Sequence, residues 1–170
     1  VSLGVDYQKV SDNDYLSDFS TTIRESSENI LNQNFWLSYG QTYWSTSIGV
    51  YKNQTLRPNR NWVEKPYEKE PEFNPSGYVA DFHGAVLDSR LTATRFRRGI
   101  STYNGLRGTS GDGNRTLWNT SISYPLMGSY WFITPKITYS LTHYNDIKHA
   151  RAEIDKSSTR SLPILSLIHI

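Results

Sequence analysis

Apolar and polar residues alternate with a period of two along much of this chain, which is the pattern of β-strands that have one apolar face. The alternation is clear in five segments, and signals for helices are weak almost everywhere. The five segments are 3–8, 35–40, 44–50, 118–124 and 130–144. The sequence therefore predicts an all-β fold.

The connections in the first half of the chain differ in how clearly they can be assigned. The short link between 35–40 and 44–50 predicts a hairpin. Four prolines within 53–77 each remove a backbone donor, so this segment is predicted to be a long loop or an edge. The polar segment 18–33 could extend a neighbouring strand or form a loop, and the sequence leaves both possibilities open.

Further along, alternation predicts one strand over 78–87 and a second over 91–96. A glycine-rich loop is expected at 99–113, and Pro125 to Gly128 should turn the chain before its last clear strand. The resulting fold class is an antiparallel meander of about six to eight strands.

A role in a membrane would have to depend on strands. No window approaches the roughly 18 consecutive apolar residues of a spanning helix, whereas a spanning strand needs only about 9–11 residues with one apolar face. Aromatic residues make up 14% of the chain, with 12 Tyr and 5 Trp, and such rings are enriched at lipid–water interfaces. A soluble β-sandwich that binds glycans also collects exposed Tyr and Trp, so composition leaves both interpretations open.

In a barrel wall, the last alternating segments would have a wet face and a lipid face. The candidates for lumen-facing positions are Lys136, Thr138, Ser140 and Thr142. The candidates for membrane-interface aromatic residues are Tyr124, Tyr130, Trp131 and Tyr144. A strand over 130–144 would extend roughly 50 Å at 3.3 Å per residue, so we expect it to project beyond the bilayer.

The chain offers little that suggests catalysis. Its net charge of +2 with mixed signs predicts no nucleic-acid partner, and the basic run Arg95–Arg98 is interpreted as solvated loop charge. The four histidines lack partners at metal-ligand spacing, so we expect no metal site and no cofactor. No set of nucleophile, acid and base stands out, and the sequence predicts a protein that is not an enzyme.

Four strings resemble a known family. They are Val10–Phe19 (VSDNDYLSDF), Ile122–Leu126 (ISYPL), Tyr130–Lys136 (YWFITPK) and Ser161–Ile164 (SLPI). Their order and approximate spacing are similar to those in the barrel domain of the LptD family, also called organic solvent tolerance proteins. The resemblance extends from about Leu3 to Leu167.

This resemblance implies that residues 1–170 are a fragment of an LptD-like β-barrel domain, from its early strands, with the barrel not complete. The family barrel lies near the ~26-strand end of the known range. Any export signal would lie upstream of Val1, because 1–10 lacks the features of a signal peptide. The lateral gate, between the first and last strands of the barrel, is expected to lie outside this segment.

The implied function is non-enzymatic transport and insertion of lipopolysaccharide at the bacterial cell outer membrane. The implied partners are lipopolysaccharide, an LptE-like lipoprotein plug and the periplasmic lipopolysaccharide-transport bridge. Two alternatives remain at this point: a soluble β-sandwich glycan-binding module, and a fragment of another outer-membrane barrel such as a porin.

Overall fold

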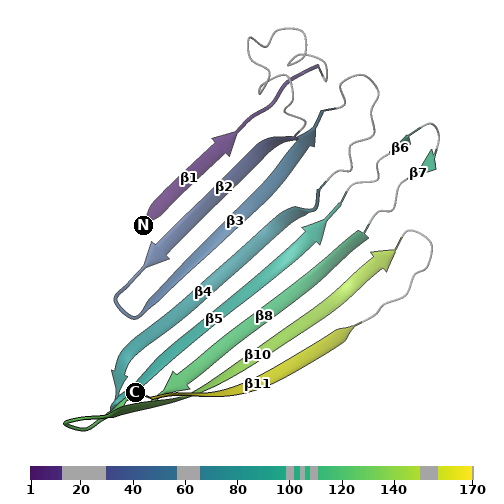
Figure 1. Ribbon diagram of the computed structural model, residues 1–170. Helices are drawn as coiled ribbons and strands as arrows, with labels where there is room; N and C mark the ends of the chain where they lie inside the picture. The colour runs from purple at the N-terminus through teal and green to yellow at the C-terminus, as the bar shows by residue number, and fades with distance from the viewer. Residues whose placement is uncertain are drawn as a thin grey trace.

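In a computed structural model, the chain forms one main antiparallel sheet and a separate two-stranded ribbon (Figure 1). The structure describes residues 1–12, 30–56, 66–98, 102–103, 106–107, 111–149 and 157–169. The main strands are β1 (Ser2–Tyr7), β2 (Ile30–Gly40), β3 (Trp44–Thr55), β4 (Glu68–Phe82), β5 (Ala85–Arg97), β8 (Gly111–Ser123), β10 (Phe132–His149) and β11 (Ser158–His169). Each pairs with its neighbour in this order, so the predicted all-β antiparallel meander is confirmed.

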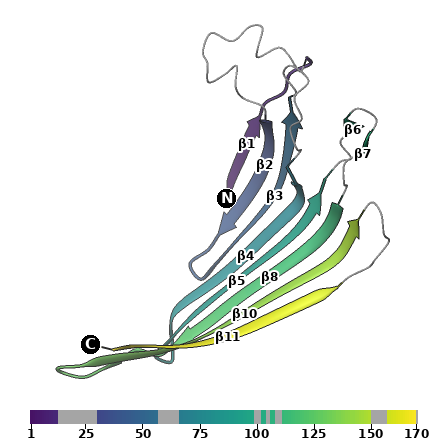
Figure 2. The ribbon, with the colours of Figure 1, turned by 45° about the vertical axis from the view of Figure 1, so that its right-hand side comes forward.

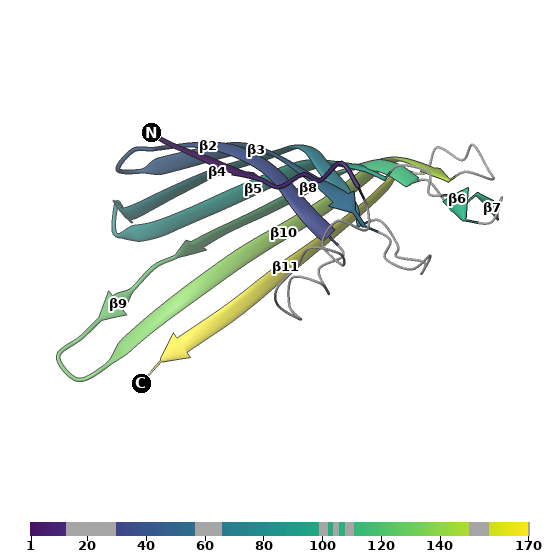
Figure 3. The same cartoon turned by 90° about the horizontal axis from the view of Figure 1, so that it is seen from above.

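Three short elements complete the fold. β9 (Leu126–Met127) pairs with the start of β10 and forms a hairpin that projects beyond the sheet (Figure 3). β6 (Thr102–Tyr103) and β7 (Leu106–Arg107) pair with each other between β5 and β8. The predicted hairpin of β2 and β3 is confirmed, with Tyr39 opposite Thr46 next to the turn.

The chain turns at His83 and Gly84, where the alternation predicted one continuous strand over 78–87. Both residues have positive φ, 53° and 86°, which is the backbone of a two-residue hairpin turn. The backbone N–H of Gly84 donates to the Asp81 carboxylate at 2.8 Å. The prediction of a single strand is therefore wrong. A two-residue turn alone would shift the alternation by one position, but the β-bulge between Val79 and Phe82 shifts it back, so the sequence pattern shows no break at the turn.

The described part of the proline-rich segment 53–77 is also different from the prediction, while 57–65 lies outside the described residues. β4 begins at Glu68 and pairs on both sides, although it contains Pro71 and Pro75. The register shifts between Lys69 and Glu72, on either side of Pro71, which has no N–H to give to the ladder. The remaining pairs on both sides hold the strand in the sheet.

The last part of the sheet extends further than predicted. β8 begins at Gly111, within the expected glycine-rich loop, and β10 runs to His149. β11 was not predicted, and it pairs with β10 from Ser158 to His169. Of the polar segment 18–33, residues 30–33 extend β2, and 18–29 lie outside the described residues.

The described sheet is a single curved layer (Figures 2 and 3). Only three hydrophobic side chains in the described ranges are buried, namely Leu31, Leu56 and Ala85. A β-sandwich would bury the inner faces of two sheets against each other. The described residues therefore do not fit the sandwich alternative.

The two ends of the sheet have different connections. The turns at 41–43 and 83–84 are short and lie at one end, together with the β9 hairpin. The strand ends that longer stretches of sequence join, from β1 to β2, β3 to β4, β5 to β8 and β10 to β11, lie at the other end (Figure 1). We call these the short-turn end and the long-connection end. No helix in the described part of the chain is long and apolar enough to cross a membrane.

Candidate functional site: the two faces of the sheet

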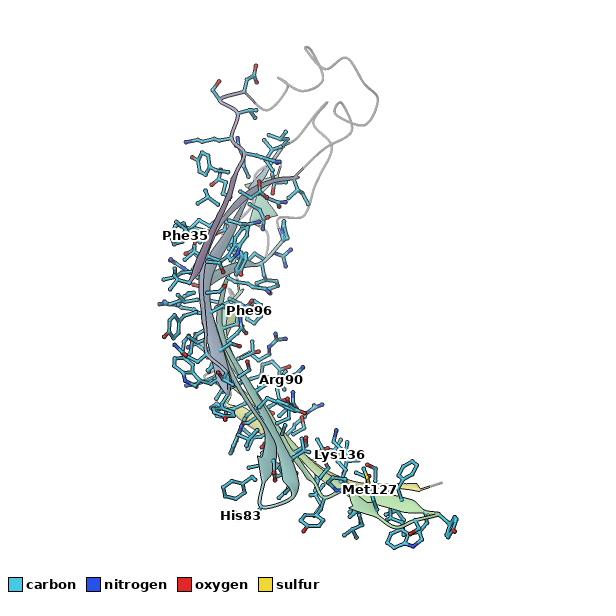
Figure 4. The ribbon with its side chains drawn as sticks, turned by 90° about the vertical axis from the view of Figure 1, so that its left-hand side faces the viewer. Phe35, His83, Arg90, Phe96, Met127 and Lys136 are labelled. Carbon is cyan, nitrogen blue, oxygen red and sulfur yellow. The ribbon has the colours of Figure 1, made fainter. Side chains whose placement is uncertain are left out.

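The convex face of the sheet is apolar. Residues paired across neighbouring strands lie on the same face, so the register identifies the members of each face. Figure 4 shows Phe35 on the convex side of the curved sheet. The same face carries Leu3, Val5, Leu37, Ile48, Phe73, Trp118, Ile122, Ile137, Tyr139 and Leu165. These side chains are accessible, with Ile137 54% and Leu165 78% exposed, so the face lacks a packing partner among the described residues.

A donor on the convex face, the Trp118 indole, is bonded within the sheet, whereas the buried Thr46 hydroxyl has no partner among the described residues. The indole N–H of Trp118 donates to the Ser89 hydroxyl at 3.0 Å, and the Trp118 ring contacts Tyr139 edge-on at 6.4 Å. A donor that already has a hydrogen-bond partner in the protein costs less free energy to remove from water. This face can therefore lie against a hydrocarbon phase.

At the long-connection end, the convex face changes from apolar to charged. Glu70 binds two cations, with its oxygens 2.6 Å from Lys52 Nζ and 3.1 Å from an Arg97 guanidinium nitrogen. Lys52 follows Ile48 by four residues on the same strand face. Both cations are about half exposed, so the apolar band ends here in a hydrated ion-pair network.

The concave face is predominantly polar. Figure 4 places Arg90 and Lys136 on this side. The register adds Asn34, Ser38, Ser47, Asn74, Ser76, Thr92, Asn119 and Ser121. Several form cross-strand hydrogen bonds: the Ser140 hydroxyl donates to the Asn119 side-chain oxygen at 2.6 Å, and the hydroxyls of Ser45 and Ser76 are 2.8 Å apart. Such a surface remains favourable in contact with water.

The structure brings the four predicted lumen-facing residues together on this concave face. Lys136 pairs with Ser123, and the alternate positions along β10 follow the same face. Those positions are Thr138, Ser140 and Thr142. The intervening Ile137, Tyr139 and Leu141 belong to the convex face.

An open hollow of about 890 Å³ lies across β2, β3, β4 and β5 near the short-turn end. Its polar lining is rich in hydroxyl groups, from Ser38, Ser45, Ser47, Ser76 and Thr92, with Asn74 and the Asp88–Arg90 pair. Asp88 and Arg90 are linked at 3.3 Å. The hollow can donate and accept hydrogen bonds, as required for hydrated polar ligands.

Near the long-connection end, the concave face carries cations over aromatic rings. Lys69 Nζ lies 5.5 Å from the centre of the Tyr51 ring, Arg98 lies 5.1 Å from Tyr67, and Arg115 lies 5.0 Å from Phe96. The Tyr67 and Phe96 rings meet edge to face at 6.1 Å, and Figure 4 shows Phe96 on the concave side. We call these six residues the cation–aromatic cluster.

The cluster was missed in the sequence because the run Arg95–Arg98 was interpreted as solvated loop charge. Arg95 and Arg97 instead belong to β5, and Arg98 follows its end. Alternation within the run places Arg97 with Glu70 on the convex face, while Phe96 and Arg98 join the cluster. The signal available in the sequence was the alternation within this run, which places Phe96 and Arg98 on the face opposite to Arg97.

Three of the four predicted interface aromatic residues lie at the short-turn end. Tyr124 follows β8, and Tyr130 and Trp131 precede β10. All three are exposed, Tyr130 by 99%. Tyr144 lies at the other end, opposite Arg115, on the same face as Lys136. It therefore does not share the convex face on which a lipid-facing ring would lie.

Further aromatic residues gather near the short turns, and the sequence reasoning did not select them. Tyr39 and Trp44 flank the β2–β3 turn with their ring centres 5.3 Å apart, Tyr43 lies within it, and Phe82 precedes the β4–β5 turn. The predicted β2–β3 turn next to Tyr39, Tyr43 and Trp44 was the signal available in the sequence, whereas Phe82 lies within the predicted strand 78–87 and had no such signal.

One part of the concave face departs from the polar pattern. On the edge strand β11, Leu162 pairs with Ser140 and Ile164 pairs with Thr138. Both are exposed, by 58% and 47%. These two side chains add an apolar element to the concave face at β11, while Arg160 and Ser166 keep it polar at other positions along the same strand.

Comparison with known proteins identifies the family. The family model for LptD, described as LPS transport system D, matches residues 1–168. The LPS-assembly protein LptD of Cupriavidus metallidurans is 31% identical over 164 residues, covering 96% of this chain and 19% of that protein. The proteins of the same name from Bordetella avium and Nitrosospira multiformis are 30% and 31% identical, covering 95% and 98% of this chain.

The chain spans about a fifth of the length of these curated relatives, with 19%, 21% and 18% of each covered. The match extends over nearly all the strands described above, including both edge strands. This chain belongs to the LptD family.

Proposed function

We propose that this chain forms eight neighbouring strands in the wall of an outer-membrane β-barrel that delivers lipopolysaccharide to the cell surface. The observation that carries the proposal is the separation of two faces on one curved layer. The apolar face is convex and the polar face is concave, as in the wall of a barrel that has lipid outside and water inside. The relatives bear the name LPS-assembly protein, which favours lipopolysaccharide as the substrate.

The two ends of the sheet suggest its orientation. Outer-membrane barrels have short periplasmic turns and longer extracellular loops. By this rule the short-turn end, with its exposed rings, faces the periplasm, and the long-connection end faces the cell surface. We further propose that these residues belong to the early strands of the family barrel, and membership of this family argues against a porin.

The proposed mechanism is passive, and no catalytic residue takes part. The concave hydroxyls and amides, with Lys136, Thr138, Ser140 and Thr142, contact the saccharide portion. The convex face holds the wall in the membrane by burying apolar surface. An LptE-like lipoprotein would occupy the rest of the lumen, and the periplasmic bridge would supply both lipid and energy.

Spin labels on β10 test the assignment of faces in the full-length protein. The chain contains no cysteine, so single cysteines at 137, 138, 140 and 141 introduce the only thiols in this segment. In native outer membranes, we expect labels at Ile137 and Leu141 to collide mainly with oxygen, which concentrates in lipid. Labels at Thr138 and Ser140 should collide mainly with a water-soluble nickel chelate. The reverse pattern would refute the proposal.

A further inference from the structure

The cation–aromatic cluster has more binding capacity than the sheet itself uses. Glu72 accounts for the charge of Lys69, because its oxygen lies 2.8 Å from Lys69 Nζ and accepts a 3.2 Å hydrogen bond from the Thr94 hydroxyl. The Asp112 carboxylate accepts a 3.2 Å hydrogen bond from the backbone N–H of Arg98. Arg115 has no carboxylate in its immediate cross-strand positions, where Thr94 and Tyr144 lie opposite it.

Arg115 also has an unused donor. Its Nε is buried and lacks a hydrogen-bond partner among the described residues. The guanidinium lies over the Phe96 ring, which stabilises its positive charge. The ring does not accept a hydrogen bond from the N–H groups that point outward in the plane of the guanidinium. A buried donor without a partner is unfavourable, and a ligand oxygen would relieve this cost.

Position and chemistry define the ligand. The cluster lies on the concave face at the long-connection end, which the proposed orientation places nearest the cell surface. Arg160 is on the same face of β11, opposite Thr142, and adds a cation nearby. An arginine fork matches the oxygens of a phosphate group, and exposed rings such as Tyr67 can pack against sugar rings.

We propose that the cation–aromatic cluster binds phosphate groups of lipopolysaccharide as the molecule moves along the concave face toward the surface. The inference rests on the proposed function. It adds a specific subsite, centred on Arg115, and a chemical class of ligand, a phosphorylated glycolipid. The Phe96 ring covers one face of the Arg115 guanidinium and leaves its outer edge to the phosphate.

Photo-crosslinking in the full-length protein, purified with its partner, tests the subsite. Tyr144→p-benzoylphenylalanine places a photoreactive ring opposite Arg115, and the same residue at Thr138 reports on the lumen in general. The probes are intact lipopolysaccharide and the same lipopolysaccharide with its phosphates removed by hydrofluoric acid. We expect Tyr144 to crosslink the phosphorylated form about tenfold more strongly, as for one charge-assisted hydrogen bond, and high salt to reduce the difference.

Substitutions supply the matched controls. Arg115→Gln should remove most of the preference for phosphate, and Arg115→Lys should restore part of it. Arg95→Gln removes the same charge from the opposite face of the neighbouring strand and should leave crosslinking unchanged. Lipopolysaccharide truncated to lipid A shows which phosphates the subsite binds. If crosslinking is retained, the subsite binds the phosphates on the lipid. If crosslinking is lost, it binds the phosphates on the saccharide. Both of these results support the subsite.

Two results would overturn the inference and are distinguishable. Equal crosslinking of both forms at Tyr144 and Thr138, unaffected by Arg115→Gln, would remove the phosphate subsite and leave the proposed function standing. Absence of crosslinks from Thr138 and Tyr144 to either form would remove the proposed function, and the subsite with it.

Discussion

Gly49 shows how a residue without a side chain can position another residue on the concave face. A Cβ at Gly49 would lie 2.7 Å from the ring of Tyr51, two residues further along β3. The ring therefore occupies the space above the glycine, and in that position it contacts Lys69. Close approach of an aromatic ring is the physical reason for a glycine here.

We expect Gly49→Ala to displace the Tyr51 ring and to weaken its contact with Lys69. The full-length protein should lose about 0.5–1 kcal/mol in free energy of unfolding, the value of one exposed cation–π contact. Urea unfolding in lipid vesicles measures the loss. Gly40→Ala is the control, because a Cβ there meets only Ser45 at an ordinary 3.8 Å. If Gly49→Ala has the same effect in a Tyr51→Ala background, the ring is not the cause.

The β4–β5 hairpin depends on its two-residue turn. Gly84 has a φ of 86°, and a Cβ on it would also approach the Tyr124 hydroxyl at 3.0 Å. The turn therefore fixes the register of β4 against β5. It also lies close to the Tyr124 side chain. An L-residue in this backbone conformation is strained.

Gly84→Ala should destabilise the full-length protein by about 1 kcal/mol or more, through backbone strain in the left-handed region. Unfolding in urea again provides the measurement. Gly77→Ala serves as the comparison, because Gly77 lies in β4, the strand that leads into this turn, with ordinary φ and its nearest neighbour at 3.7 Å. Equal losses for the two variants would contradict a special role for the turn.

At the scale of the whole molecule, the sheet has one layer, two edge strands and an accessible apolar face. β1 pairs only with β2, and β11 pairs only with β10, so each presents an unpaired ladder among the described residues. Water drives both unpaired edges and large apolar surfaces to associate. A lipid phase would cover the apolar face, and neighbouring strands would pair with the two edges.

The 170-residue segment produced alone should therefore aggregate in detergent-free buffer. Light scattering coupled to gel filtration measures this directly, and detergent micelles should reduce the particle size by covering the convex face. A monodisperse, cooperatively melting monomer in water would show that the segment hides its apolar surface in some other way.

The alternation of side chains along the sequence by itself determined the strand character of this protein. The all-β class and the grouping of Lys136, Thr138, Ser140 and Thr142 follow from period two, because successive side chains in a strand point to opposite faces. The β2–β3 hairpin follows from the short link between two alternating segments. This alternation depends only on the order of residues within one strand, so it can be read from the sequence without the structure.

Only the tertiary structure decided which strands pair, where they turn and which face is convex. Pro75 lies in a strand because β3 and β5 pair with β4 on either side, and Arg98 meets Tyr67 because the ends of neighbouring strands converge. Curvature and cross-strand neighbours depend on the register between segments distant in the chain. Period two along one strand contains no information about that register, so these features emerge only when the strands are assembled.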